Sequence, residues 1–423
     1  MGTEESGVVA IGQGLRKALL PTLVTVSQSG HLSLSEAGTC PAASVAVNYL
    51  KMRLAGTVIG DRFPEVAGID LNQPDSIKAL AAWFLASVIV RSQDWIRWNE
   101  KSRLKNRTPV WSANVGVPVE HYDSEALAIF EEVLRVAWLW AKDDRIPVAL
   151  RAALEEYRIT LERIEGEVTD FHAIPEIAAA VQSFVMSREA VPGIYVYFDI
   201  GGGTIDGVAF NYLNYGGERR INFYSGKVEP LGVSAIGAAI NGNNGEELNA
   251  ITLETLLNKI PRDVRDHYVY RVRRLVAGVV MTAKKKDGRN WQVDAIQNSD
   301  YERKFIGQLS PQRMRPLIVF VGGGGSRSAW YCSTISSTYK EFRHDSAGIP
   351  PYKMVNVPSP KDFTMRESDE GDFTRFAISY GLSIPFGEGP EIRLPSQFAD
   401  AENLKQWEPP GGINYADSKD VYD

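Results

Sequence analysis

Residues 199–206 read D-I-G-G-G-T-I-D, and they combine side chains and backbone that suit phosphate chemistry. Consecutive glycines place backbone N–H groups in a concave turn that fits phosphate oxygens, and Thr204 adds a hydroxyl donor. Asp199 and Asp206 bracket the turn with carboxylate oxygens, which suit a hydrated Mg²⁺. The segment predicts a site for a nucleoside triphosphate with its magnesium; a plain turn between two strands is the alternative.

A second glycine run follows the apolar residues 316–321 and reads G-G-G-G-S-R over residues 322–327. A helix is expected from Ala329 onward. A strand, a glycine loop and a helix in this order bind phosphates or nucleosides, because the helix N-terminus offers unpaired N–H groups. A flexible linker is the alternative, and the apolar strand directly before the glycines argues against it.

The remaining pattern predicts the elements that position these loops. Apolar residues 194–198 and 207–210 flank the first loop and predict a hairpin. The helix expected over 74–104 has an apolar start and a Trp-rich, basic end, and its tryptophans are expected to pack. The run A-A-A at 178–180 predicts a helix that packs closely. Further strands are expected at 8–11, 22–26 and 110–119, and further helices at 123–142, 146–165, 174–185 and 246–286, with another opening after Leu231-Gly232.

Composition limits the class of protein. The chain has 423 residues, 44% hydrophobic residues and a net charge of −6, which argues against nucleic-acid binding through bulk charge. Its two cysteines, Cys40 and Cys332, have no metal-binding spacing and fit a reducing compartment. The longest apolar run, at 79–90, is too short to span a bilayer. We therefore expect a cytoplasmic protein without a nucleic-acid or membrane partner.

The pairing of the two glycine motifs resembles the actin / DnaK-type chaperone / sugar-kinase superfamily. There, a D-x-G-G-G-T-x-D phosphate loop opens the second lobe and a V-x-V-G-G-G-x-x-R stretch holds adenosine. Residues 199–206 match the first motif fully, and residues 319–327 match the second well. The resemblance covers most of residues 1–387. It implies an α/β, two-lobed actin-like ATPase fold with ribonuclease H-like β-α cores and a nucleotide cleft between the lobes.

The DnaK-type heat-shock chaperones are the branch most similar to this chain. The less specific similarities are V-G-V-P at 115–118, P-E before the alanine run, L-G at 231–232 and F-A-I-S-Y-G at 376–381. The resemblance implies a first lobe at 1–190 completed by 376–387, and a second lobe at 191–375. Residues 388–423 are expected to be a polar C-terminal tail.

The resemblance also implies roles for single residues. Asp199 and Asp206 would hold magnesium-bound waters and orient an attacking water. Lys51 would stabilise charge on the transferred phosphoryl group, with an ordinary surface lysine as the alternative. Glu176 lies close to the position of the family's inter-lobe glutamate, although Ile174 precedes the proline here.

Binding of ATP or ADP falls to a larger set of residues under the same resemblance. Residues of the first loop would contact the β- and γ-phosphates, residues of the second would pack against adenosine, and two lysines would lie beside the ribose and base. These residues are Gly201, Gly202, Gly203, Thr204, Gly322, Gly323, Gly324, Gly325, Ser326, Arg327, Lys284 and Lys285. A lysine-rich helix end at 284–286 that is merely solvated is the alternative for the last two.

Two departures from the family pattern shape the expected function. Gly2 and Thr3 resemble the end of the family's first phosphate loop, whose strand and aspartate are not seen before them. We also expect no peptide-binding domain after the ATPase-like part of the chain. We expect a magnesium-dependent, slowly hydrolysing chaperone-like switch whose lobe closure is sensed by a protein partner. The alternatives are a filament-forming actin-like protein and a scaffold that has lost hydrolysis.

Overall fold

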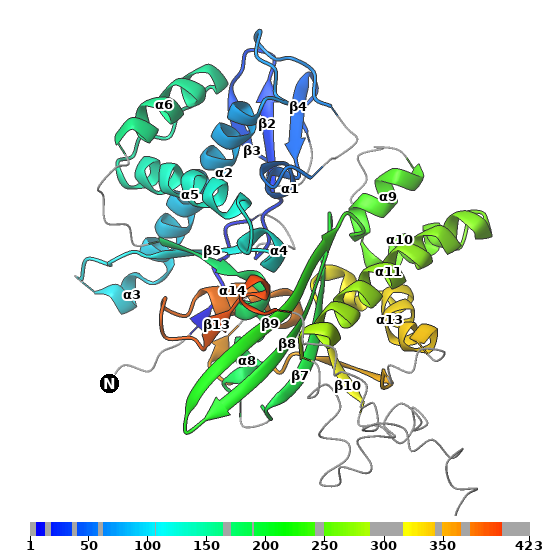
Figure 1. Ribbon diagram of the computed structural model, residues 1–423. Helices are drawn as coiled ribbons and strands as arrows, with labels where there is room; N and C mark the ends of the chain where they lie inside the picture. The colour runs from blue at the N-terminus through cyan, green and yellow to red at the C-terminus, as the bar shows by residue number, and fades with distance from the viewer. Residues whose placement is uncertain are drawn as a thin grey trace, which may run out of the picture.

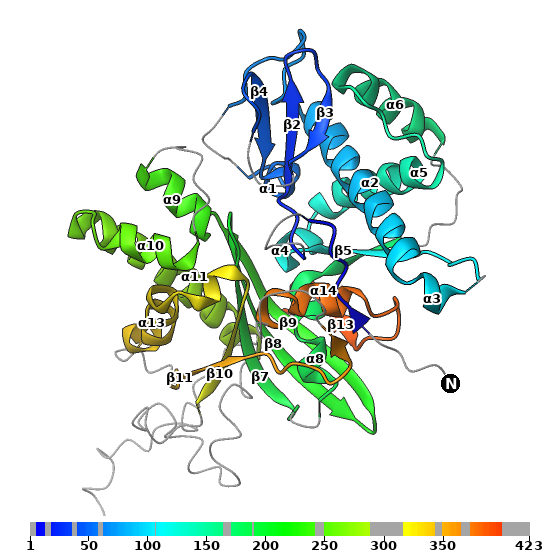
Figure 2. The ribbon, with the colours of Figure 1, turned by 180° about the vertical axis from the view of Figure 1, so that it is seen from behind.

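The computed structural model describes residues 6–12, 18–35, 40–57, 62–105, 107–163, 171–187, 190–241, 249–287, 316–342, 349–364 and 373–399. Within these ranges the chain is a mixed α/β protein, as the sequence predicts. Elements from the first part of the chain gather above the tips of a long twisted sheet, and the sheet carries helices on both faces (Figures 1 and 2).

The six-stranded sheet belongs mainly to the second half of the chain, with the strand order β11-β10-β7-β8-β9-β13. β7, β8 and β9 form an antiparallel meander, and β10 and β11 then run parallel to β7. The carboxyl ends of β7 and β10 therefore meet at one edge of the sheet. The bounds are Gly193–Ile200 (β7), Ile205–Tyr215 (β8), Glu218–Glu229 (β9), Leu317–Gly322 (β10), Tyr352–Asn356 (β11) and Glu391–Arg393 (β13).

Helices cover both faces of this sheet because its central strands are apolar on both sides. Val196 and Phe198 of β7 contribute to the core that contains residues of α9, α10, α11 and α13, whereas Tyr195 and Tyr197 contribute to the core formed with α7, α8 and α14. The bounds are Glu176–Ala180 (α7), Gln182–Val185 (α8), Val233–Asn241 (α9), Ala250–Leu257 (α10), Arg262–Asp287 (α11), Ala329–Ser337 (α13) and Ala377–Leu382 (α14).

Two small-residue helices, α7 and α14, approach each other closely. A Cβ added to Gly381 of α14 would collide with the backbone of Ala179 in α7. This confirms the close packing predicted from the alanine run. The predicted start of that helix at residue 174 is wrong, because Phe171–Pro175 form strand β6 and the helix begins at Glu176.

The first part of the chain forms a three-stranded antiparallel sheet, ordered β3-β2-β4, packed on helices. The predicted strand at 22–26 and the helices at 74–104, 123–142 and 146–165 are confirmed, with the long helix divided at Glu100. The bounds are Leu23–Ser27 (β2), Leu32–Leu34 (β3), Ser44–Asn48 (β4), Leu50–Leu54 (α1), Pro74–Asn99 (α2), Lys101–Leu104 (α3), Ala126–Lys142 (α5) and Leu150–Arg163 (α6).

Two further parallel strand pairs are short, and the second of them joins the first part of the chain to the later part. β5, Ala113–Val117, pairs with β6 and leads through Pro118 into α4, Val119–Tyr122. β1, Ser6–Gly7, pairs with β12, Phe363–Thr364. The predicted strand at 8–11 is wrong, because residues 8–11 are not in a strand and the pairing of β1 ends at Gly7 opposite Thr364.

Part of the segment predicted as a polar tail is ordered. Residues 391–393 form β13, which adds to the edge of the large sheet beside β9, and Arg220 pairs with Glu391 at 2.6 Å. The hydroxyl of Ser396 donates to Asp123 at 2.5 Å, which ties this segment to the end of α4. Residues 400–423 lie outside the described residues.

None of the helices in the described ranges is both long and apolar enough to cross a bilayer.

Candidate functional site

The tip of the β7–β8 hairpin brings two aspartates opposite each other. The antiparallel register pairs Asp199 with Asp206, and residues 201–204 form the turn between the strands. Apolar β-branched and aromatic residues on both strands favour this pairing. The predicted hairpin with a glycine tip is therefore present, and Asp206 at its base is only 3% exposed.

The glycine turn is held through its carbonyl groups. The amides of residues 232–235, at the start of α9, donate to the carbonyl oxygens of residues 201–203 at 2.7–3.2 Å. The amide of Gly201 closes the turn by donating to the Thr204 carbonyl at 2.9 Å. The next three amides, at 202–204, donate to no acceptor in the described part of the chain. The turn thus keeps N–H groups available, which is what an anion requires.

Four buried oxygen atoms beside this turn have no hydrogen-bond partner among the described residues. They are Oδ1 of Asp199, both carboxylate oxygens of Asp206 and the hydroxyl of Tyr197. Burial, with the negative charge of Glu176, raises the pKa of Asp199 to about 7. Burial, again with the charge of Glu176, raises the pKa of Asp206 well above its usual range. Unpaired buried oxygens cost free energy, so this cluster is arranged for hydrogen-bonding groups that the described chain does not supply.

The first part of the chain contributes an ion pair to the same place. Lys51 Nζ lies 2.5 Å from Glu176 Oε1, and these side chains are 39% and 13% exposed. Both charges affect the pKa values of Asp199 and Asp206, which places the four groups within electrostatic reach of one another. Glu176 also lies against Gly116 of β5, where an added Cβ would be 2.5 Å from its Cγ.

Helix α1 faces the tip of the hairpin, as both views of the ribbon show. A Cβ added to Gly203 would lie 3.0 Å from the Tyr49 ring and 3.0 Å from the Met52 sulfur. Lys51 lies between these two residues in sequence. The turn at 201–204 therefore packs directly against the helix that carries Lys51.

The second glycine loop lies beside the first. Strand β10 pairs with β7 so that Gly322 is opposite Asp199. A Cβ on Gly323 would lie 2.6 Å from Asp199 Oδ1, and one on Gly325 would collide with the Ile200 side chain. Gly323 also has φ of 75°, which favours glycine. Glycine is required here because this loop packs against the end of β7.

The rest of the second loop is an ordered turn leading into α13. The hydroxyl of Ser326 donates to the Gly323 carbonyl at 2.8 Å, while Gly324 and Arg327 are exposed. Ser328 caps α13 and donates to Glu254 of α10 at 2.7 Å. Ser328 thus links the second loop and α13 to α10, beside the edge where β7 and β10 end.

Lys284 and Lys285 are not brought to the second loop. They lie in the last turn of α11, where the next residue, Lys286, donates to the Pro395 carbonyl. That carbonyl belongs to the 3-10 turn Pro395–Gln397, which contacts β9. Two strands, β7 and β8, separate β9 from β10 in the sheet. Gly2 and Thr3 lie outside the described residues.

The donor set fits a cation held through water. In the described ranges, no group of three or more His, Cys, Asp and Glu side chains is arranged to hold a metal directly. The partnerless oxygens of Asp199 and Asp206 are instead acceptors suited to the water shell that Mg²⁺ retains.

Three residues near the site were not anticipated from the sequence. Tyr197 precedes Asp199 by two positions, and side chains two apart in a strand point to the same face. The sequence could therefore have predicted that Tyr197 lies near the site. His121 and Glu120 follow the V-G-V-P strand. Burial, with the charge of Lys51, lowers the pKa of His121, and Glu120 accepts a hydrogen bond from the Val228 amide of β9. Only tertiary packing of α4 on β9 reveals these two.

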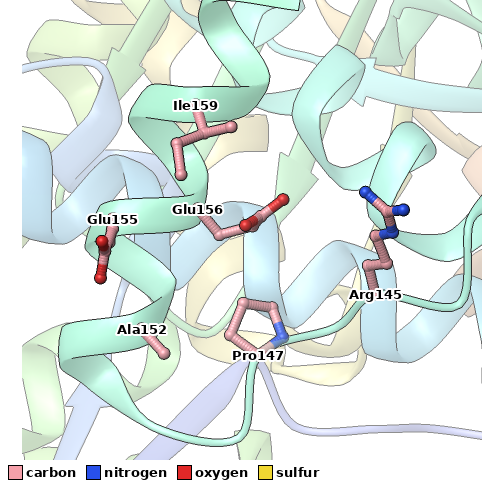
Figure 3. Close-up of a pocket in the computed structure, with 6 residues that line it drawn as sticks. All are labelled: Arg145, Pro147, Ala152, Glu155, Glu156 and Ile159. Carbon is pink, nitrogen blue, oxygen red and sulfur yellow. The ribbon is translucent and has the colours of Figure 1, made fainter.

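A separate hollow of about 480 Å³ lies on α6 and the segment before it (Figure 3). Arg145, Pro147, Glu155, Glu156 and Ile159 contribute to its lining. The hollow is open and of mixed polarity. It lies on α6, whereas the glycine loops follow β7 and β10, and neither Asp199 nor Asp206 is among its lining residues.

Comparison with known proteins gives no match: no family model fits the chain, and no curated sequence is similar to it at a significant level.

Proposed function

We propose that this chain binds ATP or ADP with Mg²⁺ between its two halves and hydrolyses ATP slowly, as a chaperone-like conformational switch. The observation that carries the proposal is the convergence of Lys51 and Glu176 with Asp199 and Asp206. The two aspartates are buried, and three of their oxygens have no hydrogen-bond partner among the described residues. A purely structural role gives no reason to bury them in this way.

The sheet topology supports a two-lobed actin-like fold. The order β9-β8-β7-β10-β11, with three antiparallel strands followed by two parallel ones, is that expected of a ribonuclease H-like core. The antiparallel strands β2–β4 and the parallel pair β5–β6 supply similar elements in the first half. In such a fold the ligand lies where the two cores face each other, and the proposal puts it beside the four charged residues.

The hydrogen bonding of the first loop supports phosphate binding. Its carbonyls are occupied by the amides of residues 232–235, and its own amides at 202–204 are available to phosphate oxygens. The second loop supports the proposed adenosine contact, because it lies against Asp199 and leaves Gly324 and Arg327 exposed. A nucleotide that spans both loops would extend along the edge where β7 and β10 end.

Catalysis would be mostly positioning and charge stabilisation. Lys51 would place its ammonium group beside the transferred phosphoryl group, with Glu176 holding that side chain in place. Asp199 and Asp206 would accept hydrogen bonds from metal-bound waters and orient the attacking water. Magnesium, when bound, supplies positive charge that offsets charge on the phosphates.

The switch would arise because the site is divided between the halves. Lys51 comes from the first half and the loops from the second, so a γ-phosphate that contacts both would favour closure. A protein partner would sense this closure. The test is ATP hydrolysis by the purified full chain, together with limited proteolysis in Mg-ATP, Mg-ADP and no nucleotide.

We expect slow, magnesium-dependent phosphate release and a different digestion pattern with each nucleotide. Asp206→Asn should abolish both effects, and Asp94→Asn, at an exposed position on α2, should abolish neither. Identical digestion patterns and no phosphate release from a folded chain would refute the proposal.

A further inference from the structure

The end of α2, the short helix α3 and residues 107–111 form a protrusion at the outer edge of the molecule. Both views of the ribbon show α3 at this edge, away from the tips of β7 and β8 (Figures 1 and 2). The Arg97 guanidinium lies 5.7 Å from the centre of the Trp111 ring, which joins the last turn of α2 to the returning segment. Trp111 in turn packs against the core around Trp138. The protrusion is therefore anchored at its base.

Large apolar side chains are left in solvent on this protrusion. Trp98 is 79% exposed and Val110 is 93% exposed. Trp98 directly follows Arg97, and Val110 directly precedes Trp111. The Arg97–Trp111 contact therefore brings both residues into the same small region. Large apolar side chains left in solvent cost solvation free energy.

Positive charge surrounds these apolar residues. Residues 91–111 contain six Arg and Lys and only two acidic residues, in a chain whose net charge is −6. Both acidic residues are already paired, Asp94 with Arg97 at 2.9 Å and Glu100 with Arg103 at 3.5 Å. Lys101, Lys105 and Arg107 are exposed and have no acidic partner among the described residues.

We propose that this basic tip, defined by Trp98, Lys101, Lys105, Arg107 and Val110, docks the protein reversibly on an anionic lipid bilayer. The indole and valine enter the headgroup layer, where tryptophan's apolar ring and polar N–H are both satisfied. The three cations pair with lipid phosphates. This departs from the expectation of no membrane partner drawn from the sequence, because contact with the surface of a bilayer requires no spanning helix.

The shape of the tip favours a flat surface over a nucleic-acid strand. A single strand needs a basic track with aromatic platforms along it, whereas these residues occupy one protruding end. A flat bilayer also touches the tip without drawing the acidic body of the chain close, because charges more than about 8 Å apart are screened at physiological salt. One tip with three cations gives weak, salt-sensitive binding.

The test is co-sedimentation of the full chain with vesicles of phosphatidylcholine alone or mixed with phosphatidylglycerol. We expect sedimentation with the mixed vesicles only, and its loss at high salt. Lys101→Glu with Lys105→Glu should weaken binding by at least about tenfold. Trp98→Ser with Val110→Ser should weaken it severalfold. All four positions are solvent-exposed, so the fold should be retained, which circular dichroism checks.

Two matched controls lie on the other half of the chain. The first control, Lys259→Glu with Arg262→Glu, makes the same change in charge at exposed positions at and just before the start of α11. The second, Ile251→Ser, removes an apolar side chain on α10 that is 73% exposed. Neither should alter sedimentation. Failure of the folded wild type to sediment would overturn the proposal, as would equal loss in tip and control variants. Tip-dependent binding of a labelled single-stranded oligonucleotide without vesicle binding would replace the bilayer with nucleic acid.

Discussion

Lys51 Nζ and Glu176 Oε1 lie 2.5 Å apart although the residues are 125 positions apart in sequence. This pair joins α1, which packs against the glycine turn, to the first residue of α7, which packs under the sheet. The pair therefore fixes a positive charge beside two buried carboxylates. Because Glu176 is largely buried, removal of Lys51 would leave a buried negative charge without its partner and so destabilise the folded chain.

The first prediction concerns Lys51. Lys51→Met should reduce the rate of ATP hydrolysis on the order of a hundredfold while leaving Mg-ATP affinity within a few-fold, because in the proposed mechanism the ammonium would act on the transferred phosphoryl group. Single-turnover hydrolysis and equilibrium binding measure the two effects. Lys78→Met is the control, since Lys78 also pairs with a glutamate, at 3.0 Å, but within the α2–α5 packing. An equal fall in both variants would mean that Lys51 only stabilises the fold.

The second prediction compares two tyrosines on one strand. The Tyr197 hydroxyl is buried without a partner among the described residues, whereas the Tyr195 hydroxyl donates to the Val191 carbonyl at 2.6 Å. Tyr197→Phe should leave the ligand-free protein as stable or more stable, because it removes an unsatisfied group, and should lower Mg-ATP affinity. Tyr195→Phe should cost about 1 kcal/mol of stability and leave affinity unchanged.

Thermal unfolding with and without Mg-ATP distinguishes these two variants. The reverse pattern, with affinity lost only in Tyr195→Phe, would remove Tyr197 from the site.

The third prediction concerns the pH dependence of stability. The pKa of Asp199 is 3.8 in ordinary surroundings and about 7 in the folded chain. The folded state then binds more protons than the unfolded state between these values, so its stability falls as pH rises from about 4 to about 7. Asp199→Asn should remove this loss and stabilise the ligand-free chain by roughly 1–4 kcal/mol at about pH 8.

Urea unfolding at about pH 5 and about pH 8 measures this difference. Asp94→Asn, on the exposed side of α2, should behave like the wild type. A variant at position 199 no more stable than the wild type at high pH would show that the carboxyl group is hydrated and ordinary.

The fourth prediction concerns the support of the glycine turn. A Cβ on Gly232 would lie 2.5 Å from the Gly202 carbonyl oxygen, so Gly232→Ala should push the turn away from the start of α9. Mg-ATP affinity should fall by at least about tenfold, since charge-assisted contacts to phosphate are worth roughly 1.5–3 kcal/mol each. Gly7→Ala, with no atom within 4 Å of the added Cβ, is the control. Unchanged affinity in Gly232→Ala would mean that this turn does not bind phosphate.

Local sequence was sufficient to predict much of the site. The hairpin at 199–206 and the loop after β10 follow from apolar strands that end in glycine, a signal carried within a dozen residues. Glu176 was placed near the site by resemblance, although Ile174 precedes the proline, and the structure pairs it with Lys51. The shift is accommodated because β6 extends to Pro175 and Glu176 opens the helix.

What the sequence did not predict depends on long-range packing. No local pattern shows that residues 391–393 add a strand to β9, because their pairing partner lies about 170 residues earlier. The positions of Lys284 and Lys285 were not predicted either, because they depend on how α11 packs across the sheet. His121 and Glu120 enter the site only because α4 packs on β9.

The most direct measurement is calorimetric titration of Mg-ATP into the full chain, with Asp206→Asn and Asp94→Asn in parallel. We predict a single binding event that is retained in Asp94→Asn and weakened by at least about tenfold in Asp206→Asn, because Asp206 is buried at the base of the turn and Asp94 is exposed on α2. Equal binding by all three proteins, or no binding by a folded wild type, would contradict the assignment of this site to a nucleotide.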